Sequence, residues 1–480
     1  MDHRDALSAE ARERLERLIR YSVEGIRRHH VAVSYTNIFV MKTWNCIAIG
    51  EQAGFPDLAA EGYGMLDAWL DHTRENGIHE YLSPTYYPVS MQPLEMIAQH
   101  AKPEAVRQKA ARALWLFWAQ IAANWFAPCN RLGGAHSRDY DYLSTGPRGN
   151  RIAQRMQAAL GYGEDADLYF PDMFLRNEMH VLVDTVPRMV YQRWGPGPGE
   201  TAAQFLGHRF SIGSAGAGYG PIDKCLTVNL GGPETPMVTF VVDARGDAYG
   251  VKRFGLADGH QKALHQTPFL TSVQRGPEAL MLAAAIPEGR HFHRSAPNPT
   301  CWLSHLVLPD TVDVWIGDAR VDIGDGPKQV AVPAGGPVFL RLGDVAVGVR
   351  FALALDTAGG AAPVALVRDE EGMAHGAMRL TCTHSDRAPD GRGIVALWVR
   401  GAEDLDEAGF AAFREGFSGP VEATVNGDVV EVSVSGLADR MRLVADVGKQ
   451  ARMAVEGAGP DATDALLVVN GRDVGREIMD

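Results

Sequence analysis

Residues 130–142 gather the side-chain types that proton transfer on an anionic ligand requires. The segment reads Asn-Arg-Leu-Gly-Gly-Ala-His-Ser-Arg-Asp-Tyr-Asp-Tyr. Its glycines oppose a helix, so we expect a loop after the predicted helix at 104–125. Loops carry a large share of catalytic residues, and His and Tyr are common proton carriers. The alternative interpretation is a solvated loop whose acidic and basic side chains pair with one another.

A second polar segment, residues 79–87, lies upstream between predicted helices and reads His-Glu-Tyr-Leu-Ser-Pro-Thr-Tyr-Tyr. In an array of helical hairpins, alternate loops emerge at the same end of the array. We therefore expect segments 79–87 and 130–142 to line one cleft. The alternative is that these tyrosines only pack against the ends of helices.

The first 195 residues have the apolar spacing of helices. Ser8 can cap the first helix, and Asn76-Gly77 is a typical helix stop. Helices are predicted after residue 8 and at 36–52, 57–75, 89–100, 104–125, 151–160 and 173–193. Their lengths and short connections indicate antiparallel hairpins in a bundle, solenoid or toroid.

After the Gly-Pro-Gly-Pro-Gly run at 195–199 the apolar period changes to two, which is typical of strands. Hairpin turns are indicated at Gly317-Asp318, Gly343-Asp344 and Asn426-Gly427-Asp428, each between alternating apolar segments. A helical insert is expected near 406–417. The sequence therefore predicts two domains, residues 1–195 and residues 196–480, and the second domain is a large antiparallel β-sandwich.

Composition excludes several classes of protein. The net charge of −13 opposes nucleic acid as a partner. No apolar run approaches the roughly 18 residues of a membrane span. The five cysteines are scattered and form no CxxC pair, so neither a disulfide framework nor a cysteine zinc site is indicated. The charged N-terminus lacks a signal core, so we expect a cytoplasmic protein, or a periplasmic or secreted one if a signal peptide has been removed.

Helical hairpins followed by a large sandwich resemble the polysaccharide lyases built from an (α/α) toroid and an antiparallel β-domain, of the heparinase II/III-like and alginate-lyase-like kinds. The supporting motifs are Asn130-Arg131, His136-Ser137-Arg138, Tyr140-Asp141-Tyr142 and Tyr86-Tyr87. The first 195 residues give fewer helices than a complete toroid of that class. The resemblance therefore implies an open or shortened toroid, and a homodimer could complete its cleft.

The resemblance implies β-elimination on a glycan that contains uronic acid. A base removes the proton at C5, and an acid protonates the leaving oxygen at C4. His136 suits the base, and Tyr140 or Tyr142 suits the acid or both roles. Arg138 and Asn130 would neutralise the carboxylate and stabilise the enolate-like transition state. This chemistry requires no cofactor.

Other residues are expected to bind the glycan. Tyr86 and Tyr87 could stack on sugar rings, and Glu80 or His79 could hydrogen-bond to hydroxyl groups. The remaining binding candidates are Arg131, Asn45, Arg176 and Tyr219. For Asn45 a polar helix face is the other interpretation. Tyr219 ends a glycine-rich segment whose better explanation is close backbone packing between the domains.

A structural metal in the β-domain, as some of the resembling lyases have, is a further expectation. His291-Phe292-His293 has the alternate spacing by which a strand places two imidazoles on one face. With Asp243 and a third histidine such as His208 or His305, these residues could hold zinc, and calcium is the other ion considered.

Two other function classes stay open. A glycoside hydrolase would use paired carboxylates, such as Glu80 with Asp139 or Asp141. A non-catalytic protein would bind glycans through its sandwich while the helices merely pack. The products separate the classes, because elimination creates an unsaturated uronate that absorbs ultraviolet light, hydrolysis creates only reducing ends, and binding creates neither.

Overall fold

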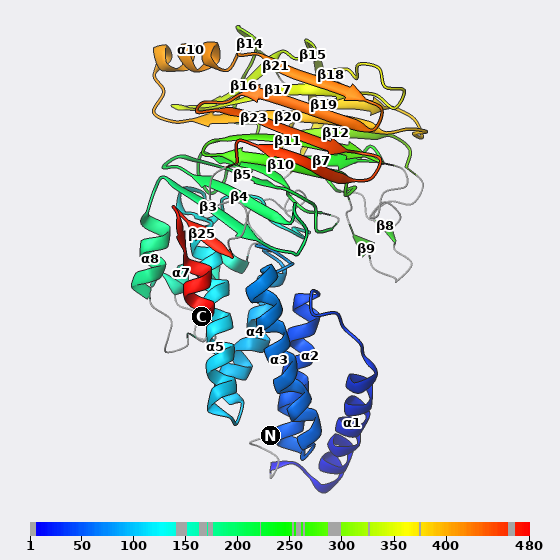
Figure 1. Cartoon of the computed structure of the whole chain (residues 1–480), viewed down its shortest axis with the longest axis vertical. Coiled ribbons are helices and arrows are strands. Elements are labelled where there is room, and N and C mark those ends of the chain that lie inside the picture. Colours follow the sequence, from blue (N-terminus) through cyan, green and yellow to red (C-terminus); the bar gives the residue numbers. More distant parts are fainter. Residues whose placement is uncertain are drawn as a thin grey trace.

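The computed structural model describes most of the chain. The described residues are 6–140, 151–162, 170, 176–220, 222–251, 254–255, 261–262, 265–286, 299–324, 327–373, 376–458 and 466–480. The N-terminal helices occupy one end of the molecule and stacked β-sheets the other (Figure 1). The predicted order of helical hairpins before antiparallel sheets is confirmed.

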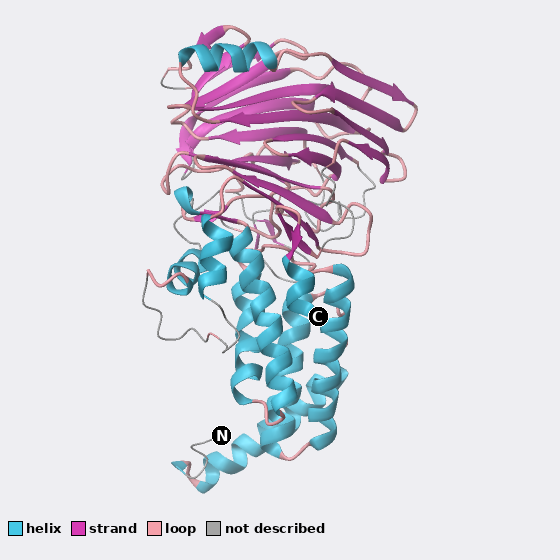
Figure 2. Ribbon diagram, turned by 60° about the vertical axis from the view of Figure 1, so that its left-hand side comes forward, coloured by secondary structure: helices cyan, strands magenta, loops and turns pink. Residues whose placement is uncertain are grey.

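The N-terminal helices run antiparallel to their sequence neighbours (Figure 2). Ser8 caps the first helix by accepting a hydrogen bond from the backbone N–H of Ala11 at 3.2 Å. Gly54, at φ 80°, ends the second helix, and Pro56 begins the third. The helices are α1 (Ala9–Arg28), α2 (Thr36–Ala53), α3 (Pro56–Asn76), α4 (Tyr86–His100) and α5 (Glu104–Ala123).

The helical prediction at 173–193 is wrong in its second half. Helix α8 (Arg176–Asp184) ends before Pro187, and residues 188–193 form strand β3 (Arg188–Arg193). The Gly-Pro run at 195–199 then connects β3 to β4 (Thr201–Leu206), which pair antiparallel within one sheet. Proline ends the helix because it cannot continue the hydrogen-bond pattern. The sheet thus begins before residue 196, inside the segment expected to be helical.

The three larger β-sheets of the described residues form stacked layers. Among the described residues, the first layer is an 11-stranded sheet in the order β15-β18-β19-β12-β7-β6-β5-β4-β3-β25-β26. Its other strands are β5 (Phe210–Ala215), β6 (Leu226–Leu230), β7 (Val238–Asp243), β12 (Trp302–Leu308), β15 (Lys328–Val332), β18 (Val364–Met373), β19 (Gly376–Ser385), β25 (Leu467–Val469) and β26 (Arg472–Asp473).

The second layer is a seven-stranded sheet, again counted over the described residues, in the order β10-β11-β20-β17-β16-β13-β14. Its strands are β10 (Phe269–Arg275), β11 (Glu278–Ala285), β13 (Asp313–Ile316), β14 (Ala319–Val321), β16 (Pro337–Leu342), β17 (Val345–Leu355) and β20 (Gly393–Ala402). Every residue of β11 is buried, which is expected of a strand covered on both faces.

The third layer is the sheet of β21 (Val421–Asn426), β22 (Val429–Ser435), β23 (Arg440–Asp446) and β24 (Ala451–Glu456). Strand β23 of this layer contacts β10 and β11 of the second layer. Strand β5 of the first layer contacts the same two strands. The seven-stranded sheet therefore lies in the middle, with a separate apolar core on each side. The predicted sandwich is present, and it has three layers, whereas a sandwich ordinarily has two.

The predicted hairpins of the sandwich are confirmed. Gly317, Gly343 and Gly427 connect β13 to β14, β16 to β17 and β21 to β22, and all three have φ near 60°. This left-handed conformation suits glycine, which has no Cβ. The expected helical insert is α10 (Glu407–Gly416), capped by Asp406.

The C-terminus returns to the helical domain (Figure 1). Strand β25 pairs with β3, and α11 (Val474–Met479) packs against α5. Arg74 and Arg112 donate hydrogen bonds to the carbonyl oxygen of Met479 at 3.3 and 3.2 Å. The C-terminal residues therefore connect the 11-stranded sheet to the helices.

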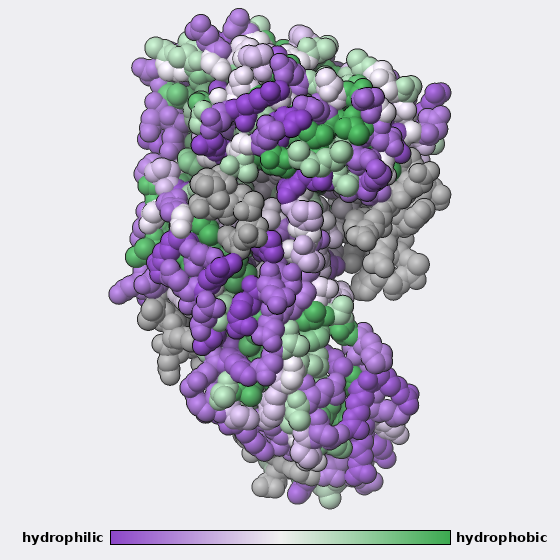
Figure 3. All heavy atoms as spheres, viewed as in Figure 1, coloured by the Kyte–Doolittle hydropathy of each residue, from purple (hydrophilic) through white to green (hydrophobic). Residues whose placement is uncertain are grey.

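The surface in Figure 3 is mainly hydrophilic over the helices, with hydrophobic atoms visible only in small groups. Among the described helices, none combines the length and apolar character needed to cross a membrane.

Candidate functional site

The densest polar cluster of the predicted segments surrounds the guanidinium of Arg138, where the helices meet the 11-stranded sheet. Tyrosine rings lie around it, with the guanidinium carbon 4.4 Å from the ring centre of Tyr86, 5.5 Å from Tyr140, and 6.0 Å from both Tyr35 and Tyr219. These distances are in the range of cation–π contacts. Together with Glu80 and Asn37, described next, these residues are called the Arg138 cluster.

Glu80 binds the inner side of the guanidinium. Its Oε1 accepts a hydrogen bond from Arg138 Nη1 at 2.6 Å, and its side chain is 1% exposed. Asn37 donates its backbone N–H to Oε2 at 3.0 Å and its Nδ2 to Oε1 at 3.1 Å. Burial raises the pKa of Glu80, and Arg138 and the Asn37 N–H oppose that shift. The carboxylate also faces the N-terminus of α2, where a negative charge is favoured.

Tyr140 receives several hydrogen bonds at one oxygen. Arg138 Nε and Nη2 donate to its hydroxyl at 3.1 and 2.6 Å, and the hydroxyl of Tyr86 donates to it at 3.3 Å. Donors that converge on one oxygen can stabilise negative charge there. Burial is the main cause that raises the pKa of both Tyr86 and Tyr219, which favours their neutral phenol forms.

Neighbouring side chains stabilise the positive charge on Arg138. Burial opposes this charge, but the neighbouring Tyr140, Tyr86 and Glu80 outweigh burial and raise the pKa of the guanidinium. Within the described part of the chain, the guanidinium uses one N–H toward Glu80 and two toward Tyr140. Two of its five N–H groups remain for a ligand. Its side chain is 14% exposed, so a ligand would meet a largely desolvated cation.

The loop of Arg138 is held between the two domains. Ser137 donates its backbone N–H to the carbonyl oxygen of Tyr81 at 2.9 Å on the helical side. His136 and Lys224 exchange backbone hydrogen bonds of 3.2 and 2.9 Å on the sheet side. Arg138 itself has φ 48°, which is uncommon for a residue with a side chain.

His136 lies beside the cluster, but both its ring nitrogens have partners. Nδ1 is 2.8 Å from the carbonyl oxygen of Gly134, and Nε2 is 3.0 Å from Oδ2 of Asp139. His136 is 2% exposed. Both partners are acceptors, so the two hydrogen bonds form together only if the imidazole carries both protons or Asp139 carries one. The ring of His136 thus lies between two oxygen atoms of neighbouring residues.

Other predicted residues lie elsewhere. Tyr87 is buried, donates its hydroxyl to Gln120 Oε1, and packs edge-on against Phe117 at 4.8 Å between ring centres. Tyr86 and Tyr87 thus point in different directions from the start of α4. His79 is also buried and stacks on His72, with 2.8 Å between their Nε2 atoms. Burial lowers the pKa of His79 to about 4.

Arg131 and Asn130 have local structural partners. Arg131 donates to the carbonyl oxygens of Cys129, Gly232, Pro233 and Thr235, and so fixes the loop after β6. Asn130 turns the chain at φ 52° between the short strands β1 (Trp125–Phe126) and β2 (Arg131–Leu132). Its Oδ1 accepts a hydrogen bond from Gln157 at 2.8 Å.

Asn45 and Arg176 are exposed on α2 and α8, and Arg176 donates to the carbonyl oxygen of Ala158 at 3.2 Å. Neither residue has a contact with the Arg138 cluster among the described residues. Tyr142 and Asp141, and the predicted zinc ligands His291 and His293, lie outside the described residues.

Sequence reasoning overlooked Tyr35. Tyr35 precedes α2, and Asn37 lies in its first turn. Both therefore lie at the end of α2 to which the carboxylate of Glu80 is hydrogen-bonded. The available signal was a polar, aromatic helix start, Ser-Tyr-Thr-Asn, before an apolar helix. Asp223, whose carboxylate contacts the Arg138 loop, was overlooked as well.

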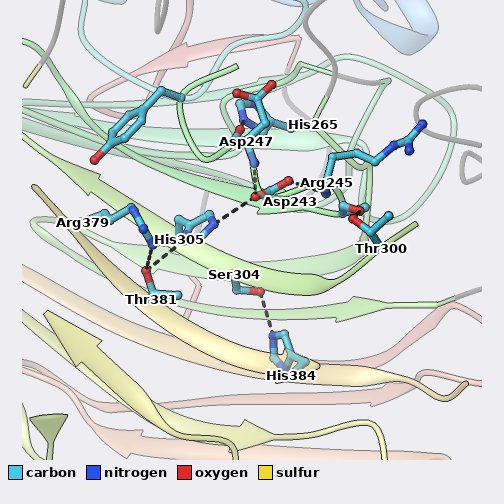
Figure 4. Close-up of polar contacts among 12 residues, drawn as sticks. Asp243, Arg245, Asp247, His265, Thr300, Ser304, His305, Arg379, Thr381 and His384 are labelled. Carbon is cyan, nitrogen blue, oxygen red and sulfur yellow. Dashed lines mark hydrogen bonds and ion pairs between the residues drawn. The ribbon is translucent and has the colours of Figure 1, made fainter. Parts of the chain in front are cut away.

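A separate polar network lies in the 11-stranded sheet (Figure 4). His305 lies between Asp243 and Thr381, with Nε2 3.5 Å from Asp243 Oδ2 and Nδ1 3.0 Å from Thr381 Oγ1. Although burial opposes its charge, hydrogen bonds from His305 and the Arg245 N–H lower the pKa of Asp243 to about 2. Arg379 donates to Thr381 at 2.6 Å.

The expected zinc site includes His291 and His293, which lie outside the described residues, so it stays a prediction. Both oxygens of Asp243 accept backbone N–H groups, from Arg245 and Asp247 at 2.7 Å. Across the described ranges, no group of three or more His, Cys, Asp or Glu side chains converges as metal ligands. Asp243 and His305 do meet, as expected, but as hydrogen-bond partners of each other.

Comparisons with known proteins add little. A family model described as a domain of unknown function, DUF8769, matches residues 7–157. No curated protein matches the chain. A structure of chondroitinase AC lyase in oligosaccharide complexes is 12% identical, with a TM-score of 0.41, and the alignment covers 90% of this chain and 77% of that one.

A heparinase III structure is 12% identical, with a TM-score of 0.32, and the alignment covers 85% of this chain. The chain spans 65% of the length of that heparinase III. At such TM-scores the two similarities support no inference about the site, so any assignment of function depends on the geometry of the Arg138 cluster.

Proposed function

We propose that this protein is a lyase that cleaves uronate-containing glycans or oligosaccharides by β-elimination, with its active site at the Arg138 cluster. The supporting observation is the guanidinium of Arg138, which tyrosine rings enclose and buried Glu80 binds. Among the described residues, two of its N–H groups have no partner and could bind a ligand. Planar guanidinium groups bind carboxylates, and aromatic rings pack against sugar faces.

In the proposed reaction, Arg138 binds the uronate carboxylate and stabilises the charge that develops when C5 loses its proton. Tyr140 acts as the base, because its oxygen lies between the Arg138 donors and the Tyr86 hydroxyl. The electron pair from the C5–H bond forms the C4–C5 double bond, and the C4–O4 bond breaks. A phenol then protonates the leaving oxygen, and Tyr140 itself can return the proton.

This proposal changes the role first expected of His136. Its two ring nitrogens are directed to Gly134 and Asp139, so we assign the base to Tyr140 and give His136 a supporting role. Tyr35 and Tyr219 would pack against the sugar, since their rings flank the guanidinium.

Glycosidase chemistry is less well supported by the same contacts. A retaining or inverting glycosidase needs one carboxyl group that protonates the leaving oxygen and a second that attacks the sugar or activates water. Both oxygens of Glu80 accept hydrogen bonds from Asn37 or Arg138, and Asp139 is paired with His136. Neither carboxyl group is free for those roles in this arrangement.

The proposal is tested by ultraviolet absorbance during incubation with alginate, glucuronan, ulvan, hyaluronan, chondroitin and heparan glycans. We expect absorbance to rise with one of these glycans, and to rise far more slowly in Arg138→Ala. Tyr249→Phe is a matched control, because it removes a hydroxyl group that donates to Asp369 at 2.5 Å in the sheet domain. New reducing ends without absorbance would instead indicate hydrolysis and reject the proposal.

A further inference from the structure

The carboxyl group of Asp223 joins the two loops that carry Arg138 and Tyr219. Its Oδ1 accepts the backbone N–H of Arg138 at 3.0 Å. Its Oδ2 accepts the backbone N–H groups of Tyr219 and Gly220 at 2.6 and 2.8 Å. One partly buried side chain therefore links the loop that follows the helices to the loop between β5 and β6.

The bond to Arg138 matters because of the backbone conformation there. A left-handed conformation is unfavourable for a residue with a side chain, so surrounding contacts must maintain it. Arg138 has φ 48°, and its N–H points to Asp223. Because the backbone conformation sets the direction of the side chain, loss of this hydrogen bond would let the guanidinium move away from Tyr140 and Glu80.

We propose that Asp223 is a positioning residue of the Arg138 cluster, which fixes Arg138 and Tyr219 relative to each other without contacting the substrate. The catalytic consequence of this role depends on the proposed lyase function, but the hydrogen bonds themselves do not. The residue belongs to the β-domain, so the role also makes the active site dependent on correct contact between the two domains.

An amide cannot replace this carboxylate. Asp223 meets N–H donors with both oxygens, whereas an asparagine has one oxygen and one NH₂ group. In Asp223→Asn, the NH₂ group would face either the N–H of Arg138 or those of Tyr219 and Gly220. Two donors would then oppose each other, and one of the loops would lose its hydrogen bond.

Burial raises the pKa of Asp223 to about 6, although the N–H groups of Gly220, Arg138 and Tyr219 and the charge of Lys224 oppose the shift. Experiments should therefore be made well above pH 6, where the carboxylate is charged and accepts all three N–H groups. The side chains of Tyr81, Tyr219 and Cys225 are the other titratable groups that interact with it among the described residues.

The first measurement is hydrogen exchange of the backbone amides of Arg138, Tyr219 and Gly220. We expect faster exchange at these amides in Asp223→Asn. Asp243→Asn is the matched control, because that carboxylate also accepts backbone N–H groups, from Arg245 and Asp247. We expect it to leave exchange at the three amides unchanged.

The second measurement is a double-mutant cycle on glycan turnover. We expect Asp223→Asn to lower kcat/KM by about ten- to a hundredfold, the scale of a misplacement of about 1 Å. In an Arg138→Ala background the same change should alter kcat/KM by less than about twofold, because the two residues act as one unit. An equal fall in both backgrounds would show that Asp223 acts on the fold alone and would overturn the proposal.

A third measurement does not depend on a glycan substrate. If no glycan is cleaved, the lyase function is rejected, but the positioning role of Asp223 can still be tested. In protein labelled with [15N]arginine, the Nε–H signal of Arg138, identified with Arg138→Lys, reports its hydrogen bond to Tyr140. We expect this signal to shift or broaden in Asp223→Asn and to stay in place in Asp243→Asn. An unchanged signal in Asp223→Asn would overturn the positioning role.

Discussion

At Arg138, one side chain combines an ion pair, aromatic contacts and hydrogen bonds to a phenol. A lysine at this position could keep the charge and approach Glu80, but it could not donate to Tyr140 through two nitrogens while presenting a planar face to Tyr86. A comparison of arginine with lysine at position 138 therefore separates the effect of the positive charge from the effect of the planar guanidinium shape.

We predict that Arg138→Lys lowers kcat/KM for glycan elimination by about a hundredfold or more, because bidentate binding of the uronate is lost. Arg341→Lys is the matched control. Arg341 pairs with Glu407 at 2.7 Å and lies 4.7 Å from the ring centre of Phe410, in the sheet domain. Equal activity losses in the two variants would mean that arginine shape matters only for folding.

Substitution of Tyr140 and substitution of Tyr86 should have different effects on kcat. We predict that Tyr140→Phe lowers kcat by about a thousandfold, within the usual range for loss of a general base or acid. Tyr86→Phe should lower kcat by only about tenfold, because it removes one of the donors to the Tyr140 oxygen. Steady-state kinetics on the best glycan measure both effects. The assignment of the base to Tyr140 fails if Tyr140→Phe retains most of the wild-type kcat.

Local sequence could identify part of the Arg138 cluster. The segments 79–87 and 130–142 were expected to meet, and Glu80 and Tyr86 do contact Arg138. The individual roles could not be foreseen, because they depend on which way each side chain points. Tyr86 and Tyr87 are adjacent in sequence, yet only Tyr86 reaches the cluster and Tyr87 packs in the core.

At the scale of elements, Arg188 connects the helices to the first sheet. It is 1% exposed and donates to four carbonyl oxygens. Those of Ala123 and Trp125 lie at the end of α5 and just beyond it, and those of Val183 and Thr185 lie in the last turn of α8 and just beyond it. Burial lowers its pKa to about 10, which is still far above neutrality. A single cation thus satisfies carbonyl groups that the ends of two helices leave unpaired.

We predict that Arg188→Met destabilises the fold by roughly 2–5 kcal/mol, because several buried carbonyl groups would lose their donor. Urea unfolding measures this change. Arg209→Met serves as the control, since Arg209 is half exposed and pairs with Asp344 at the surface. The account of Arg188 would be contradicted if both variants unfold at the same urea concentration.

Elements whose signals lie within a few residues were predicted well. The glycine turns and the insert at α10 belong to this group, because turn geometry and capping are local. Strand β3 was missed because its partners are β4 and β25, and β25 lies at the far end of the chain. A short amphipathic segment becomes a strand only when such distant partners exist.

For the whole molecule, the stacking of three sheets could not be foreseen from the alternation of apolar and polar residues along the sequence. Strands β11 and β20 are buried almost throughout, and a continuous apolar strand is equally compatible with a buried helix segment. Their burial results from one sheet on each face. The middle sheet thus separates the helical domain and the proposed active site from the third layer.

Two buried histidines should make the fold sensitive to acid. Burial lowers the pKa of both His79 and His265 to about 4, whereas an unfolded histidine has a pKa of about 6.5. The unfolded chain therefore binds these protons first as the pH falls. Their effect is absent above about pH 6.5, and stability is lost progressively between about pH 6.5 and pH 4.

We predict a loss of roughly 1–3 kcal/mol for each histidine across that interval, and a smaller loss in His79→Gln. Urea midpoints measured at about pH 7 and about pH 5 test this expectation. Replacement of the exposed His208 should leave the pH dependence as it is in the wild type. A wild-type midpoint that does not fall on acidification would contradict the assigned burial of these residues.

Elimination of uronate glycans by the Arg138 cluster is tested by the ultraviolet absorbance of the wild-type protein beside Arg138→Lys on the same glycan panel. We expect rising absorbance with at least one uronate glycan and nearly none in the variant. A flat trace for the wild type across the panel, or equal rates for the two proteins, would show that the cluster does not carry out this reaction.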